Sequence, residues 1–119
     1  MDWTTENNYR VAVVKVCEKI NKNGWGEVHA GNISVKIDSN IILCTPHGIN
    51  LGEVSVSDLI KVDIKGKKLE GVLEPTSELK MHLTVYKNRS DIRSVIHSHP
   101  PYSTAFAITS LDFSEVILP

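Results

Sequence analysis

Residues 95–101, which read Val-Ile-His-Ser-His-Pro-Pro, constrain the fold of this chain more than any other segment. The short β-branched run at residues 94–96 predicts a buried strand that ends in His-x-His. Because side chains at i and i+2 of a strand point to the same side, we expect His97 and His99 to face one point. The two prolines that follow end the strand and suit the start of a helix. The pair is a candidate metal site, although this spacing alone is a weak signal.

The composition predicts a single soluble domain. The chain has 119 residues, with 41% hydrophobic and 23% charged residues and a formal net charge of -1, so nothing favours a nucleic-acid or anionic-membrane partner. No apolar run reaches the length of a membrane span, and the polar, acidic N-terminus is unlike a signal peptide. Cys17 and Cys44 show no pairing logic, which predicts two buried free thiols in a cytoplasmic protein.

Hydrophobic periodicity predicts helices alternating with short strands. In the first predicted helix, Val13, Cys17 and Ile20 form one apolar stripe, and in the second Leu79, Leu83 and Tyr86 do so. The predicted helical segments are 5–22, a short turn at 55–59, a helix capped by Thr76 or Ser77 that runs to about 87, and 101–109. The predicted strands are 33–37 and 41–45 as one hairpin, 60–64 and 67–69 as a second, then 94–97 and the beginning of another at 115–118.

Glu78 follows a Pro-Thr-Ser sequence at the start of the second helix. A carboxylate in the first turn is stabilised by the helix dipole, so capping is the simple interpretation. The functional alternative is a third metal ligand, or a general base, beside His97 and His99. His82 lies one turn further along the same helix face. It is a ligand, a group that holds Glu78, or a hydrogen-bonded core histidine, and the last two interpretations are favoured.

Three loops combine backbone N–H groups with small polar side chains. They are Gly31-Asn32 before one strand, His47-Gly48 after the next, and Thr76-Ser77 at a helix start. Brought together, they would bind a phosphate dianion, whereas each one alone is common turn chemistry. No nucleotide-binding glycine motif is present, and no lysine has the apolar context that imine catalysis needs.

Taken in order, residues 30–35, 45–49, 75–82 and 95–105 resemble the class II aldolase/adducin family. The similarity covers nearly the whole chain, so we interpret residues 1–119 as one domain of this family. The resemblance implies an α/β fold, a three-layer α/β/α sandwich around a mixed, mainly antiparallel sheet that is incomplete here. It also implies a ring-like homotetramer with active sites at subunit boundaries.

The resemblance implies the site residues as well. Glu78, His97 and His99 would be ligands of Zn²⁺, with Glu78 doubling as the catalytic acid/base group. The implied reaction is zinc-dependent aldol cleavage of a ketose phosphate, which gives an aldehyde and dihydroxyacetone phosphate or a glycolaldehyde phosphate-type product. The residues expected around the substrate phosphate are Gly31, Asn32, His47, Gly48, Thr76 and Ser77.

The chain departs from the family pattern at two points. Well-known sugar-phosphate aldolases carry a small hydroxyl residue at the position of His47, so an imidazole there suits a carboxylate or another headgroup. The family's third histidine ligand lies well downstream of the His-x-His, and no histidine follows His99. We therefore expect this chain to be the N-terminal part of such a protein, as an inactive fragment or a shortened relative.

Two other functions stay open. A JAMM-type zinc metalloprotease also combines an upstream glutamate with His-Ser-His-Pro, but Asp112 falls one position late and Ile108 stands where its serine should be. A non-catalytic, adducin-like assembly module would keep the fold and not rely on the chemistry.

Overall fold

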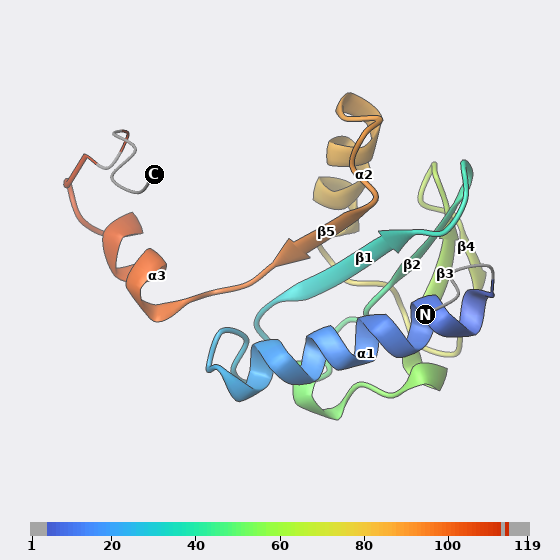
Figure 1. Cartoon of the computed structure of the whole chain (residues 1–119), viewed down its shortest axis with the longest axis horizontal. Helices are drawn as coiled ribbons and strands as arrows, with labels where there is room; N and C mark the ends of the chain where they lie inside the picture. Colours follow the sequence, from blue (N-terminus) through green and yellow to red (C-terminus); the bar gives the residue numbers. More distant parts are fainter. Residues whose placement is uncertain (1–4, 113, 115–119) are drawn as a thin grey trace.

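The computed structural model describes residues 5–112 and 114. The predicted order of helices and strands is confirmed within this range (Figure 1). The strand expected to begin at 115–118 lies outside the described residues. The elements are α1 (Glu6–Lys22), β1 (Asn32–Lys36), β2 (Ile41–Cys44), two 3-10 turns (Leu51–Glu53 and Val56–Asp58), β3 (Ile60–Asp63), β4 (Lys68–Glu70), α2 (Leu79–Asn88), β5 (Ser94–His97) and α3 (Pro101–Ala107).

The strands form one open sheet in the order β4-β3-β2-β1-β5, and every pair among the described residues is antiparallel. Both predicted hairpins are present, as β1–β2 and β3–β4. The carboxylate of Asp38 closes the first turn by accepting from the backbone N–H of Asn40, at 2.6 Å, and of Ile41, at 2.9 Å. Asp63 does the same in the second turn, where it accepts from the N–H of Lys65 and Lys67. Aspartate has this effect because its short side chain reaches backbone groups two to four residues ahead.

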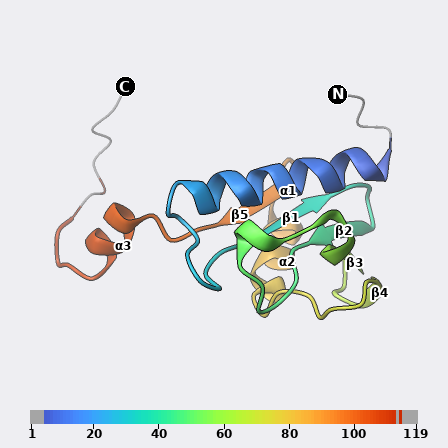
Figure 2. The ribbon, with the colours of Figure 1, turned by 90° about the horizontal axis from the view of Figure 1, so that it is seen from below.

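Helices cover both faces of the sheet, so the expected three layers are confirmed (Figures 1 and 2). On one face, the predicted α1 stripe packs with residues of β1 and of the segment after β2; this cluster is Val13, Cys17, Ile20, Ile33, Leu51, Val54 and Leu59. On the other face, α2 packs against β2 and β3; this cluster is Ile42, Cys44, Ile60, Val62, Leu79 and Tyr86.

Strand β1 separates the two kinds of surface. Ile33 and Val35 pack in the α1 cluster, whereas the side chains of Asn32 and Ser34 form hydrogen bonds with α2 residues. This division follows from the alternation of side chains along a strand. A polar stripe of the sheet therefore lies under α2 and leads toward the His-x-His segment.

Three details of the predicted helices are corrected or extended. Helix α2 begins at Leu79, and Glu78 is its N-cap residue, so neither Thr76 nor Ser77 occupies the cap. The hydroxyl of Thr76 instead accepts from the Glu78 N–H at 3.3 Å, which forms a tight turn just before the helix. Leu83 packs against the α2 cluster as predicted but is only partly buried, and His82 is the additional fully buried residue of α2. The last helix, α3, is shorter than expected, and it stands apart from the body of the molecule (Figure 1).

The two cysteines are buried and free, as the sequence predicts. Burial raises the pKa of both the Cys17 and the Cys44 thiol to about 12, so neither is a reactive thiolate at neutral pH. They belong to the clusters on opposite faces of the sheet. Within the described residues, we find no helix with the length and apolar character needed to cross a membrane.

Arg10 is a buried charged residue that the apolar stripe of α1 did not predict. Its guanidinium donates to the carboxylates of Glu6, at 2.8 Å, and Glu70, at 2.9 Å. It also donates to the backbone carbonyls of Val56, at 3.3 Å, and Leu59, at 3.2 Å. One side chain therefore ties α1 to the edge strand β4 and to the 3-10 segment.

We expect Arg10→Ala to lower the free energy of unfolding by about 2 kcal/mol, because two backbone carbonyls lose their donor at about 1 kcal/mol each. Urea unfolding followed by circular dichroism measures the change. The matched control is Lys15→Ala on the exposed side of the same helix, which should change stability by less than about 0.5 kcal/mol. Equal effects of the two substitutions would contradict the role assigned to Arg10.

Candidate functional site

The pairing of β1 with β5 brings the first residues of the site together. Asn32 lies directly opposite His97 in this antiparallel pair, so the two side chains emerge on the same face of the sheet. Glu78, at the N-cap of α2, reaches this point from the helix above. Its Oε2 lies 2.5 Å from Asn32 Nδ2 and 2.5 Å from His97 Nδ1. A carboxylate from a helix end and an imidazole from a strand end are thus in direct contact.

His99 lies beside His97, as expected for residues i and i+2. The ring centroids are 4.7 Å apart and the rings are tilted by 43°. The His99 N–H donates to the carbonyl of Trp25 at 2.6 Å, which holds this segment against the loop after α1. Among the residues that the structure describes, however, no three His, Cys, Asp or Glu side chains are grouped as ligands of one metal ion. His97 contacts Glu78 on one side and His99 on the other. A carboxylate and two imidazoles are donor types that suit a divalent metal.

His82 is fully buried, and both of its ring nitrogens have partners. Nδ1 lies 2.7 Å from Ser34 Oγ, and Nε2 lies 2.5 Å from Asn32 Oδ1. Ser34 Oγ also lies 2.7 Å from the Tyr86 hydroxyl. His82 is therefore a hydrogen-bonded core histidine, and its ring is linked to the Glu78 carboxylate by hydrogen bonds through Asn32. A metal-ligand role for His82 is wrong for this arrangement, because both ring nitrogens are hydrogen-bonded.

Electrostatics keep the Glu78 carboxyl ionised. The hydrogen bond donated by Asn32 lowers the pKa of Glu78 below its usual value, and the hydrogen bond with His97 acts in the same direction. The Glu78 side chain is 43% exposed and that of His97 is 28% exposed. The group is therefore a solvent-accessible carboxylate with one oxygen held by two partners.

The loops predicted to bind phosphate are joined by backbone hydrogen bonds. Pro46 and Pro75 form an antiparallel bridge. Next to it, the His47 N–H donates to the Glu74 carbonyl at 2.8 Å, and the Thr76 N–H donates to the Thr45 carbonyl at 3.1 Å. The end of β2 and the approach to α2 consequently run side by side, and both lie beside the start of β1.

A cavity of about 260 Å³ lies where these loops meet. Besides Glu78 and His99, it is lined by all six residues expected around a phosphate, which are Gly31, Asn32, His47, Gly48, Thr76 and Ser77. Ala30, Pro46 and Ile49 complete the wall together with His29, a residue that our sequence analysis missed. Its position two residues before Gly31, which was expected to contact phosphate, was the signal that could have identified His29.

Gly31 is required at its position for two reasons. Its φ of +90° lies in the left-handed region that favours glycine, and an added Cβ would lie 3.0 Å from the carbonyl oxygen of His97. The turn before β1 can therefore approach the end of β5 only because residue 31 has no side chain. Gly48 also has a positive φ, of +77°, on the facing loop, and there an added Cβ would meet open space.

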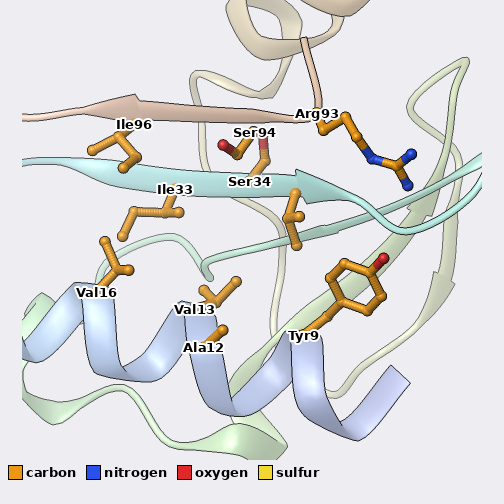
Figure 3. Close-up of a pocket in the computed structure, with 10 residues that line it drawn as sticks. Tyr9, Ala12, Val13, Val16, Ile33, Ser34, Arg93, Ser94 and Ile96 are labelled. Carbon is orange, nitrogen blue, oxygen red and sulfur yellow. The ribbon is translucent and has the colours of Figure 1, made fainter. Parts of the chain in front are cut away.

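A second cavity, of about 520 Å³, lies between α1 and the strands β1 and β5 (Figure 3). Its wall is mainly apolar, and it holds neither Glu78 nor any of the five histidines. This wall contains no His, Cys, Asp or Glu side chain, so it offers none of the usual ligands for a metal ion. The smaller, polar cavity is thus the candidate functional site. The wall residues of the larger one are Tyr9, Ala12, Val13, Val16, Ile33, Ser34, Val35, Arg93, Ser94 and Ile96.

Comparison with known proteins agrees with this geometry. The sequence model of the class II aldolase and adducin N-terminal domain matches residues 11–117. The chain belongs to the class II aldolase and adducin family. This membership confirms the resemblance inferred from the four motifs and argues against the metalloprotease alternative.

Relatives in the class II aldolase and adducin family include enzymes with different names. An L-fuculose phosphate aldolase of Methanococcus vannielii is 39% identical over 80% of this chain and 51% of its own length. A 3-oxo-tetronate 4-phosphate decarboxylase of Pectobacterium atrosepticum is 32% identical over 98% of this chain and 53% of its own length. The crystal structure of YgbL from Escherichia coli is 31% identical, with a TM-score of 0.86 over 96% of this chain and 55% of that one. The chain thus spans about half the length of the relatives it matches.

The buried histidine gives a prediction about stability and pH. Burial lowers the pKa of His82 from 6.5 to about 4, and His97 nearby acts in the same direction. The unfolded chain therefore takes up a proton between these values that the folded chain does not, so stability is present above pH 6.5 and decreases as the pH falls. We expect the free energy of unfolding to decrease by about 2 kcal/mol from pH 7.5 to pH 5.

Denaturant unfolding at a series of pH values measures this dependence. His82→Gln is the control, because it removes the titrating ring and should flatten the curve above pH 5, where few carboxylates titrate. Parallel curves for the two proteins would contradict the assignment of a neutral, buried His82.

Proposed function

We propose that this chain carries metal-binding residues of a class II aldolase site that cleaves a sugar phosphate by a retro-aldol reaction. The contact of Glu78 with His97 beside the polar cavity is the observation that carries the proposal. The named relatives support the substrate class, since fuculose phosphate and 3-oxo-tetronate 4-phosphate are both phosphorylated.

The donor set fits a divalent cation, and we propose Zn²⁺. Glu78, His97 and His99 offer one carboxylate and two imidazoles, which are common zinc ligands. Glu78 and His99 line the polar cavity, and His97 contacts both of them. A cation held there would supply Lewis acidity at the substrate carbonyl.

The polar cavity would hold the phosphate of the substrate. Gly31, Gly48 and the Thr76-Ser77 turn line the cavity, and turns and helix starts of this kind offer backbone N–H groups to anions. His29 and His47 add two imidazoles to the same wall. Binding the phosphate away from the reacting carbons would fix the orientation of the substrate, which contributes to catalysis.

Glu78 would act as the acid/base group. Its carboxyl is ionised and solvent-accessible, so it is able to accept a proton from the substrate. Asn32 and His97 both engage Oε2, which leaves Oε1 outside this pair of hydrogen bonds. We also propose that the protein acts in the cytoplasm, which rests on its two free thiols. A homotetramer is proposed on the family resemblance alone.

We expect calorimetric titration to detect one Zn²⁺ per chain, bound through Glu78 and the His-x-His pair. Glu78→Gln and His97→Ala should each weaken binding by about 10-fold or more, because each removes a ligand. Glu18→Gln, an exposed carboxylate of α1, is the matched control and should leave the affinity unchanged.

Release of aldehyde from L-fuculose 1-phosphate, followed by a coupled assay, tests the reaction itself. Glu78→Gln should abolish most turnover and leave phosphate binding measurable, because the phosphate wall is intact. Zinc binding that is insensitive to both Glu78→Gln and His97→Ala would instead favour the adducin-like assembly module.

A further inference from the structure

A buried ladder of polar side chains stands behind Glu78. The N-cap residue Glu78 is followed in α2 by His82 and Tyr86 at intervals of four residues. On the facing side, β1 presents Asn32 and Ser34 two residues apart. Four residues of helix rise by about 6 Å, and two residues of strand rise by about 6.7 Å. Because the two repeats nearly match, helix and strand side chains meet alternately and form a continuous chain of hydrogen bonds.

The carboxylate at one end gives this chain a direction. Ionised Glu78 only accepts, so Asn32 must donate through Nδ2 and turn Oδ1 toward His82. Because Oδ1 also only accepts, His82 must carry its proton on Nε2. Nδ1 then accepts from the Ser34 hydroxyl, and Ser34 accepts from Tyr86.

The far end of the ladder is fixed as well. Burial raises the pKa of Tyr86 to about 12, so its phenol remains protonated and able to donate to Ser34. In the described part of the chain, no buried side-chain nitrogen or oxygen lacks a hydrogen-bond partner. A phenol that donates and a carboxylate that accepts thus leave one consistent arrangement of protons between them.

We propose that Ser34, His82 and Tyr86 are positioning residues, which fix the orientation of the Asn32 carboxamide and through it hold Glu78 in place. The inference rests on the proposed function, in which Glu78 binds the cation and moves a proton. The three residues lie between α2 and β1 and outside the wall of the polar cavity, so they would act without touching the substrate.

The Ser34 hydroxyl is the critical element. Without it, the His82 ring is free to move its proton to Nδ1, and Nε2 then no longer donates to Asn32. The Asn32 carboxamide can then rotate so that its Nδ2 donates to Nε2 of His82. This rotation turns Oδ1 toward the carboxylate of Glu78. Two facing oxygens repel each other, so Glu78 loses both a hydrogen bond and its defined position.

The test compares Ser34→Ala and Tyr86→Phe with Val13→Ala, a core truncation on the opposite face of the sheet. Nitrogen-15 NMR of the metal-free chain reports which ring nitrogen of His82 carries the proton. Zn²⁺ affinity, and kcat and KM for L-fuculose 1-phosphate, report the effect on Glu78. Glu78→Gln, measured in parallel, tests the proposed function separately.

We expect the unmodified chain to show His82 protonated on Nε2 and Ser34→Ala to show a mixture of the two neutral forms. Ser34→Ala should lower zinc affinity or kcat by about 10- to 100-fold with KM unchanged. Tyr86→Phe should have a smaller effect, because Ser34 still donates to His82, and Val13→Ala should have none beyond its loss of stability.

Two results would overturn the proposal. One is a His82 proton found on Nδ1 in the unmodified chain. This measurement does not depend on the folding of any variant. The other is a Ser34→Ala protein whose zinc affinity and kcat match those of Val13→Ala while Glu78→Gln is impaired. If Glu78→Gln is itself unimpaired, the proposed function fails, and the NMR measurement still decides whether the ladder has the proposed direction.

Discussion

The site depends first on the register between β1 and β5. Asn32 faces His97 across this antiparallel pair, so both side chains lie on the α2 face of the sheet. A slip of one residue would turn Asn32 and Ser34 toward α1 and bring Ile33 under α2. Gly31 allows the pair to close at this end, because any side chain there would press on the His97 carbonyl. The alternation of β1 and the glycine before it thus specify the same register.

The second requirement is the start of α2 above this end of the sheet. The bridge between Pro46 and Pro75 fixes the chain just before the helix, and the Thr76 hydroxyl accepts from the Glu78 N–H. Glu78 is therefore held by backbone geometry at its own position and by Asn32 at its carboxylate. The same bridge aligns the loops of the polar cavity, so one short contact positions both the carboxylate and the wall expected to bind phosphate.

Local patterns in the sequence predicted the helices and strands well, but they did not predict the contacts between them. The α1 stripe and both hairpins follow from periodicity and turn residues that are near one another in the chain. The buried ladder could not be predicted in this way, since His82 pairs with Ser34 and Asn32 from 48 and 50 residues away. Arg10 was missed for the same reason, because its partners lie on distant segments that only the folded chain brings together.

Spacing alone also could not separate the roles of the histidines. His82 and His97 both lie close to Glu78 in sequence or in space, and both are plausible ligands by residue type. The fold distinguishes them by burial and by the use of their ring nitrogens. His82 is enclosed with Nδ1 and Nε2 both occupied, so its ring is suited to transmit an orientation. His97 is partly exposed and meets Glu78 through Nδ1, which places it where a cation and the substrate have access.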